Sequence, residues 1–294
     1  MTEVLQYVID GAALGSLYAL FALGIGLIFG IMNLINFAHG ELVMVGGYVL
    51  VFVSAPSTIV RVTLMIVIVI VFALVMERVA FRPVRGARAD TLLVTSFAVS
   101  FLLQSLAIVL IGALQKSVGI LSSLNESFTV GELSIRKLDV FTVAVTAGLL
   151  AALVVFLGRT RLGVQMRAAA EDFRMARALG VRANTVIATA FALSGLLAAV
   201  AALILVAQTG VVSPTMGLTV VLAAFIATIV GGLGSLTGAV LGGYVLGALT
   251  VALQATLPLG YRPYRDAFVF AIVVLVLILR PQGLISSRAV VERV

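Results

Sequence analysis

Long apolar runs separated by short polar breaks occupy most of the chain. A helix that crosses a bilayer needs about 20 apolar residues, and these runs lack the strict alternation of outer-membrane strands. Helices also satisfy their own backbone hydrogen bonds in lipid. The pattern therefore predicts an all-α, polytopic transmembrane helix bundle of about eight or nine spans. We expect these spans at 9–31, 40–55, 59–76, 92–113, 139–158, 185–207, 218–230, 238–257 and 266–279.

Three of the runs are short, and we expect some spans to be broken or re-entrant; the short runs are 40–55, 218–230 and 266–279. No polar stretch is long enough for a separate soluble domain, so residues 1–294 are predicted to form a single transmembrane domain.

The segments GELVMVGGYVL (40–50) and GSLTGAVLGGYVL (234–246) resemble each other. Many transporters contain internal repeats whose broken helices meet in the membrane. The resemblance therefore predicts a two-fold internal repeat with halves near 9–113 and 185–279. A chance similarity between two apolar helices is the alternative.

Composition agrees with a membrane location. Hydrophobic residues make up 62% of the chain and charged residues 11%, whereas soluble domains carry roughly 25% charged residues. The net charge of +7 is better explained by arginines on the cytoplasmic side than by nucleic-acid binding. With no cysteine and one histidine, thiolate and multi-histidine metal sites are excluded.

Arginines concentrate in the segments 78–88, 159–182 and 280–293. The positive-inside rule places all three in the cytoplasm, together with the C-terminus. The segment 114–138 and the N-terminus then fall outside.

The stretch NLINFAHGELVMVGGY (33–48) places polar side chains between two apolar runs. Asn33, Asn36 and His39 are spaced by three residues, which predicts one helix face, and Gly40 permits a break before Glu41. An unpaired polar group in hydrocarbon costs several kcal/mol. The segment either lines a substrate pathway or forms a wet cytoplasmic turn, and the residues alone leave both open.

The stretch VGGLGSLTG (230–238) predicts a second break, with free backbone groups at Gly231, Gly232 and Gly234 and a hydroxyl at Ser235. Exposed backbone at membrane depth requires protein or a cavity around it, so these residues are also candidates for the pathway. A tight turn is the alternative, and a phosphate-binding loop is excluded because the P-loop lysine is absent.

The loop 159–184 is too long for a simple connector and is predicted to contain a short amphipathic helix over 165–179. Its apolar side chains recur at helical spacing: Met166, Ala169, Ala170, Phe173, Ala176 and Leu179. Another face carries Arg167, Glu171 and Arg174, and Gly180 supplies a C-terminal stop. The helix either lies on the membrane or docks in a partner's groove. Its small, mostly alanine face favours the partner.

Three stretches resemble the branched-chain amino acid permease family of ABC importers over about residues 8–285. They are GSLYALFALGIGLIFGIMNLINFAHGELVMVGGY, FIATIVGGLGSLTGAVLGGYVLG and LRPQGL. The pattern of Ala170 and Glu171 followed by Gly180 resembles the coupling loop that docks on the ATPase in such importers. The chain resembles the first of the family's two permease subunits.

This resemblance implies a permease of the bacterial inner membrane that is not an enzyme and binds no metal or other cofactor. Two partner ATPases, which use ATP and Mg²⁺, would drive it, since the chain has no Walker pattern. A second permease subunit (or a second copy) and a periplasmic solute-binding protein would complete the assembly. The elements 33–48 and 230–243 would then lie side by side along the path.

Other functions remain open at this stage. The solute is expected to be a branched-chain or other small neutral amino acid, with urea or short amides as an alternative. An ion-coupled carrier or channel acting alone would need carboxylates within the membrane, for which Glu41 is the main candidate. A non-transporting scaffold is the third possibility.

Overall fold

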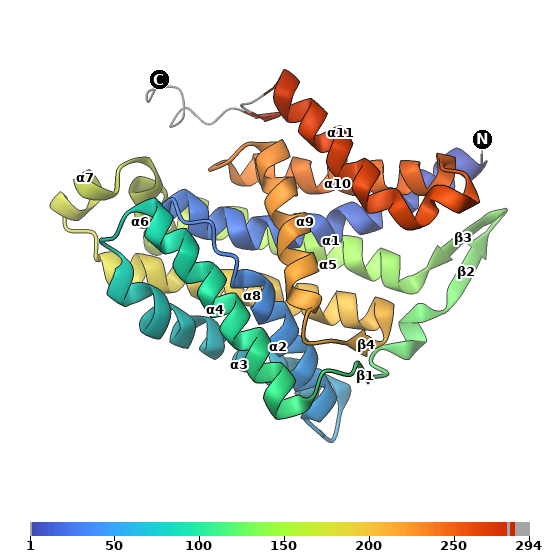
Figure 1. Ribbon diagram of the computed structural model, residues 1–294, viewed down its shortest axis with the longest axis horizontal. Helices are drawn as coiled ribbons and strands as arrows, with labels where there is room; N and C mark the ends of the chain where they lie inside the picture. The colour runs from blue at the N-terminus through green and yellow to red at the C-terminus, as the bar shows by residue number, and fades with distance from the viewer. Residues whose placement is uncertain (1, 281–282, 286–294) are drawn as a thin grey trace.

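The computed structural model describes residues 2–280 and 283–285, and this part of the chain is a bundle of α-helices (Figure 1). The α-helices are α1 (Thr2–Met32), α2 (His39–Phe52), α3 (Thr58–Met76), α4 (Ala89–Ile111), α5 (Lys137–Arg159), α6 (Arg161–Glu171), α7 (Phe173–Ala178), α8 (Ala183–Thr209), α9 (Met216–Gly231), α10 (Leu236–Thr256) and α11 (Arg265–Leu279). Tighter or wider helical turns are η1 (Glu77–Phe81), η2 (Arg82–Val84), η3 (Ser122–Asn125) and η4 (Leu259–Tyr264). The strands are β1 (Lys116–Ser117), β2 (Ser127–Val130), β3 (Leu133–Arg136) and β4 (Val211–Val212).

Each predicted span corresponds to one helix, and the prediction of an all-α membrane bundle is confirmed. Six helices in the described chain are long and apolar enough to cross a membrane, namely α1, α3, α4, α5, α8 and α10. The short apolar helices α2 and α9 account for two of the short runs. Two small antiparallel ladders, β2 with β3 and β1 with β4, were not predicted. The two-fold repeat stays a prediction.

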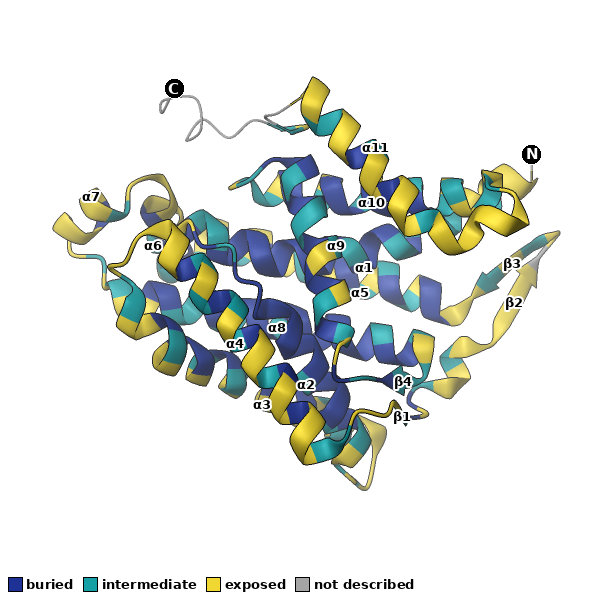
Figure 2. Ribbon diagram, in the orientation of Figure 1, coloured by how far each residue is buried: buried dark blue, intermediate teal, exposed yellow. Residues whose placement is uncertain are grey.

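Two helices form the centre of the bundle. In α1 and α8, 78% of the most apolar stretch is buried inside the protein, against 22% in α3, α4 and α5. Figure 2 shows this arrangement, with the long exposed stripes on α3, α4 and α11. These outer helices expose apolar side chains, as expected for helices that contact lipid.

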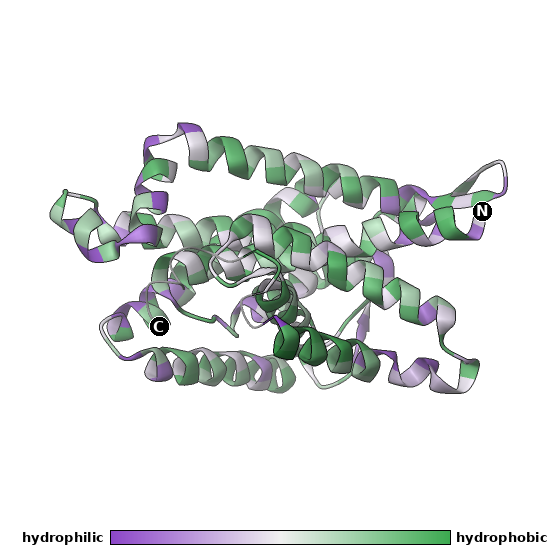
Figure 3. Cartoon of the chain, turned by 90° about the horizontal axis from the view of Figure 1, so that it is seen from above, coloured by the Kyte–Doolittle hydropathy of each residue, from purple (hydrophilic) through white to green (hydrophobic). Residues whose placement is uncertain are grey.

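The two ends of the bundle differ in charge and shape. Hydrophilic residues collect toward the ends of the long helices and apolar ones along their length (Figure 3). We call one end the hairpin end; it carries β2 and β3, which bind the start of α1 through Gln6 and Ser134 at 3.0 Å. There Lys137 donates to Glu126 at 2.6 Å and lowers the pKa of that carboxyl.

The opposite end, the arginine end, carries the segments 77–88 and 159–182. Arg85 forms an ion pair with Glu77 and donates to Asn184 Oδ1 at 2.7 Å, so the segment after α3 contacts the start of α8. Past α11, Leu284 N donates to Val230 O at 2.8 Å, which brings residues 283–285 to the same end. Arg288 and Arg293, which we assigned to the cytoplasmic tail, lie outside the described residues.

Small residues at four-residue spacing let α1 and α10 approach closely. A Cβ atom at Gly243 would approach Ala19 Cα to 2.6 Å, and one at Gly15 would approach Tyr244 Cα to 2.9 Å. A methyl group at Gly247 would overlap the Gly15 backbone. The contact between these two helices is the most extensive in the bundle.

Gly243→Val is therefore expected to destabilise the bundle by at least the roughly 1–3 kcal/mol that overpacking usually costs, because the side chain meets backbone. Thermal unfolding in detergent measures the effect. Gly148→Val in α5 is the matched control, since a Cβ there meets nothing within 4 Å. Equal melting temperatures for the two variants would contradict the packing argument.

Candidate functional site

The polar segment 33–38 is not helical. Helix α1 ends at Met32, Asn33 adopts a left-handed backbone with φ 50°, and α2 begins at His39. The prediction that Asn33, Asn36 and His39 share one helix face is therefore wrong. Ser96 of α4 holds the extended segment, because it accepts from Phe37 N at 3.3 Å. Its single hydroxyl proton is shared between Ile35 O at 3.1 Å and Leu93 O of its own helix at 2.8 Å.

The two asparagines have different environments. Asn33 is exposed at the arginine end. Asn36 is fully buried, its Oδ1 accepts from Ala38 N at 3.1 Å, and its Nδ2 has no partner in the described chain. Phe37 stacks on Phe97 with ring centroids 3.9 Å apart and closes the segment on the side of α4.

His39 lies at the junction of α1, α2 and α8. Its Nδ1 is 2.9 Å from Ser194 Oγ, which also donates to Gly24 O at 3.0 Å. A hydroxyl has one proton and a carbonyl only accepts, so His39 Nδ1 is the donor when both bonds form. Nε2 then carries a lone pair and has no partner within the described residues. A methyl group at Gly24 would overlap the imidazole, so only glycine fits there.

Glu41 lies two residues further along α2, on the opposite side of that helix from His39 and between α4 and α9. Its Oε1 accepts from Ser100 Oγ and from Gln104 Nε2, both at 2.8 Å. Its Oε2 has no partner in the described chain and lies 2.8 Å from the position that a Cβ of Gly217 would take. His39 and Glu41 are 0% exposed, so neither side chain faces lipid.

Gly40 does not interrupt the helix, since α2 includes it. A methyl group at Gly40 would overlap the Gly217 carbonyl group, so Gly40 instead permits close contact with α9. Asn36, His39 and Glu41, with Ser194 on the α8 side of α2 and Ser100 on its α4 side, are together called the buried polar cluster.

The predicted break at 230–238 is confirmed. Helix α9 ends at Gly231 and α10 begins at Leu236, with positive φ of 114° at Gly232 and 85° at Gly234. Ser235 caps α10 by accepting from Gly238 N at 3.0 Å. A methyl group at Gly231 would overlap the Gly238 carbonyl, so these glycines permit a tight turn.

Glu41 lies far from the second predicted pathway segment. Helix α2 packs on α8, α9, α3 and α4, and Glu41 lies by Gly217 at the start of α9. Gly231 is at the other end of that helix, about 20 Å away at 1.5 Å per residue. The end of α1 that leads into 33–48 is nearer to the turn, because Gly30 and Ile31 line a cavity of about 320 Å³ together with Gly234. Arg167 and Glu171 of α6 line the same cavity. The expectation that 33–48 lies beside 230–243 stays a prediction.

The loop 159–184 contains two helices, α6 and α7, so the prediction of one helix over 165–179 is wrong. Asp172 has an extended backbone (φ −145°) and caps α7 by accepting from Arg174 N and Met175 N at 2.8 and 2.9 Å. Aspartate is a preferred N-cap residue, so the sequence contained the signal for this break.

The apolar stripe of this loop divides between the protein and solvent. Met166, Ala169 and Ala176 are buried, whereas Leu179 is 80% exposed and Met175 59% exposed. Of the other residues predicted for the coupling loop, Phe173 is partly buried, and Arg167, Ala170, Glu171 and Arg174 are exposed. Helix α7 therefore presents an uncovered apolar edge flanked by charge.

Gly180 stops α7 as predicted. Its φ is 90°, its N–H donates to Arg177 O, and Val181 N donates to Ala176 O, both at 3.0 Å. These two bonds form a Schellman motif, which requires a left-handed residue at this position.

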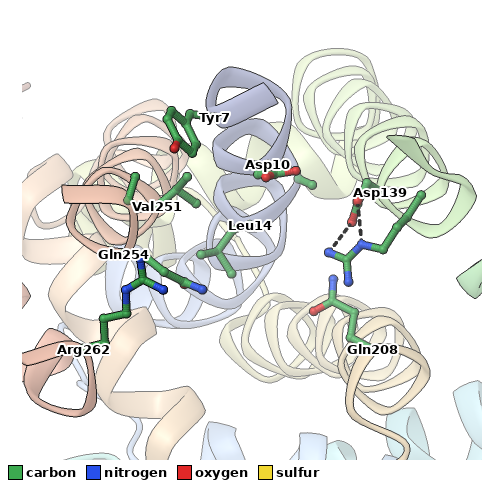
Figure 4. Close-up of a pocket in the computed structure, with 11 residues that line it drawn as sticks. Tyr7, Asp10, Leu14, Asp139, Gln208, Val251, Gln254 and Arg262 are labelled. Atoms are coloured by element: carbon green, nitrogen blue, oxygen red, sulfur yellow. Dashed lines mark hydrogen bonds and ion pairs between the residues drawn. The ribbon is translucent and has the colours of Figure 1, made fainter. Parts of the chain in front are cut away.

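Two groups of residues were missed from the sequence. Ser96, Ser100 and Gln104 recur every four residues on α4, and this polar stripe in an apolar run was a readable signal. A cavity of about 350 Å³ at the hairpin end was also missed; its polar lining includes Asp10 and Arg262 (Figure 4). These residues are far apart in the sequence, so no local pattern joins them.

Residues 7–277 match the family model described as branched-chain amino acid transport system / permease component. The chain is 36% identical to the high-affinity branched-chain amino acid transport system permease protein BraD of Pseudomonas aeruginosa, over 99% of this chain and 98% of BraD. It is 34% identical to the corresponding LivH of Escherichia coli K12, over 99% and 97%. The solved structure of PsaBC from Streptococcus pneumoniae in complex with Fab has a TM-score of 0.49 at 15% identity, over 94% of this chain and 92% of that chain.

Proposed function

The chain belongs to the family of branched-chain amino acid transport system permease components, and we propose that it imports branched-chain amino acids as the membrane subunit of an ATP-driven importer. The observation that most strongly supports this function is the 36% identity to BraD over 99% of this chain. The match extends over both the central helices and the loop 159–184, so the transport path and the coupling element both fall within it.

In the proposed orientation the arginine end lies in the cytoplasm of a bacterial inner membrane and the hairpin end outside. The support is the concentration of arginines in 78–88 and 159–182 at one end of the bundle. The N-terminus then lies outside, and α11 returns the chain to the cytoplasm.

Each end of the bundle is proposed to bind a different partner protein. Helices α6 and α7 present exposed Met175 and Leu179 beside Glu171 and Arg174, a surface suited to a groove on an ATPase. Two such ATPases hydrolyse ATP, because this chain has no Walker motif. A second permease, identical or related, completes the path, and a solute-binding protein delivers amino acid at the hairpin end.

The buried polar cluster is proposed to line the path in another state of the transport cycle. Three of its atoms, Asn36 Nδ2, His39 Nε2 and Glu41 Oε2, are buried without a partner in the described chain. Each unsatisfied buried group costs roughly 1–3 kcal/mol, and such groups need an explanation. A state in which the Gly40–Gly217 contact opens would give Glu41 Oε2 a polar partner such as solute. His39 Nε2 lies against Gly24 instead, so it would need a separation of α2 from α1.

The function is tested by reconstitution with the partner ATPases, the second permease and the binding protein in vesicles. Labelled leucine should accumulate only when ATP is present on the side of the membrane that carries the ATPases. Unlabelled valine or isoleucine should compete with its uptake. Urea or short amides competing better than valine would favour the alternative solute. Leucine uptake by the permease alone, driven by an ion gradient, would contradict the importer assignment.

A further inference from the structure

The cavity at the hairpin end is built from four helices of this one chain. Helices α1, α5, α8 and α10 line it, and η4 lies at its rim. Its lining residues on α1 are Tyr7, Asp10, Ala13 and Leu14. Tyr7, Asp10 and Leu14 repeat at three- to four-residue spacing and so share one helix face.

Charges of opposite sign lie on opposite sides of this cavity. Figure 4 shows Asp10 on one side and Arg262 on the other, with Leu14 between them. Asp10 Oδ1 accepts from the neutral Gln6 at 3.0 Å, and Asp10 forms no ion pair with any described residue. Arg262 Nε donates to Leu257 O at 3.4 Å, and within the described chain its charge is likewise unpaired.

The other polar residues of the cavity do not cancel this separation. Asp139 is buried and forms a bidentate ion pair with Arg136, at 2.9 and 3.1 Å, so this pair is neutral as a unit. Gln254 accepts from Arg265 at 2.9 Å through Oε1, which leaves its amide N–H groups to donate on the Arg262 side. The cavity therefore has one anionic side and one cationic, donor-rich side.

An apolar cavity adjoins the charged one. It has a volume of about 340 Å³, and it shares Leu14 and Gln208 with the charged cavity. Leu17, Phe21 and Val220 are among its lining residues. Leu17 and Phe21 continue the face of α1 that begins with Tyr7 and Asp10, so both cavities lie along one side of that helix.

We propose that these two cavities form a binding site for a free branched α-amino acid in its zwitterionic form. Asp10 receives the ammonium group, Arg262 and Gln254 receive the carboxylate, and the aliphatic side chain points past Leu14 into the apolar cavity. The proposal rests on the import function above and adds to it a solute site on the permease itself.

A ligand that carries only one of the two charged groups of an amino acid is expected to bind this site weakly. An amine without a carboxylate leaves Arg262 unused, and a carboxylate without an amine leaves Asp10 unused. Charge-assisted hydrogen bonds are about twice as strong as neutral ones, so each half contributes to affinity. A buried aliphatic side chain adds roughly 1.5–3 kcal/mol when it leaves water, which favours leucine over glycine.

The test is equilibrium dialysis of labelled L-leucine against the detergent-solubilised complex of both permeases and both ATPases, without the binding protein, up to millimolar concentrations. Saturable binding is expected, with displacement by valine and not by isoamylamine or 4-methylpentanoate. Asp10→Asn and Arg262→Gln should each weaken binding about tenfold or more, and Asp10→Glu should retain it. Glu3→Gln and Arg88→Gln, at exposed charges outside both cavities, should bind like the parent.

The same variants are then reconstituted with the binding protein. Slower ATP-driven leucine uptake by Asp10→Asn and Arg262→Gln, at unchanged melting temperature, supports the site. If the parent complex imports leucine but binds none saturably, or binds it equally in both variants, the site is wrong and the import function stands. If the parent imports no leucine, the import function fails, and leucine binding that both variants lose still supports the site.

Discussion

Replacement of Glu41 by leucine is expected to lower the free energy of unfolding by about 2–4 kcal/mol and to abolish uptake. Glu41 Oε1 accepts from Ser100 and Gln104 at 2.8 Å inside the bundle. Leucine leaves both donors without this acceptor, and each buried unsatisfied group costs roughly 1–3 kcal/mol. Two effects limit the loss: the amide of Gln104 keeps its 3.1 Å bond to Ser100, and leucine removes the unpartnered Oε2. Thermal unfolding in detergent and uptake in vesicles measure the two effects.

A triple variant separates structure from function. Glu41→Leu combined with Ser100→Ala and Gln104→Leu removes the donors together with the acceptor, and such matched apolar replacement is often nearly neutral. We expect its stability to return to within about 1 kcal/mol of the parent while uptake stays lost. If uptake returns with stability, the cluster only supports the fold and our pathway proposal for Glu41 is wrong.

The helices could be predicted from the sequence because lipid imposes a simple requirement. A spanning segment must be apolar over about 20 residues and must satisfy its own backbone, and the runs at 92–113 and 139–158 meet both conditions. The observed α4 and α5 differ from those ranges by a few residues at each end. Breaks were also predictable where glycines cluster, as at 230–238.

The site was less predictable because contacts distant in the sequence decide it. Asn33 and Asn36 follow helical spacing, yet Ser96, about 60 residues away, holds the segment extended by bonding to Phe37 N and Ile35 O. Likewise, the partner of His39 is Ser194, 155 residues further along the chain. A spacing rule describes one helix and does not reveal which serine of another helix lies opposite.

The loop 159–184 was only half predictable for a different reason. Apolar spacing indicates a continuous helix, but Asp172 competes with the helix for backbone N–H groups and starts a new one. The stop at Gly180 was predictable because it depends on local conformation alone. A substitution at Gly180 is expected to have a large effect on transport.

Gly180→Val is expected to reduce ATP-driven uptake about tenfold or more, with little change in melting temperature. A left-handed backbone costs a non-glycine residue roughly 1–2 kcal/mol, and it is least compatible with a β-branched side chain. At φ 90°, valine therefore favours another conformation, and the bonds from Gly180 N and Val181 N that end α7 are lost. Leu179 and Met175 then move relative to the ATPase surface we propose, while the buried helices keep their contacts.

The measurement is uptake and ATP hydrolysis in the same vesicles. Hydrolysis without matching uptake, or loss of the ATPase from the complex, is the expected result for Gly180→Val. Glu171→Lys should act in the same direction, because it reverses the charge on the proposed ATPase-docking surface and would repel a basic group that pairs with Glu171 there. Gly158→Val, in the last turns of α5, is the matched control, since a Cβ there meets nothing within 4 Å and no left-handed backbone is involved. If Gly180→Val and Glu171→Lys assemble and transport like this control, α7 is a solvated connector and coupling occurs elsewhere.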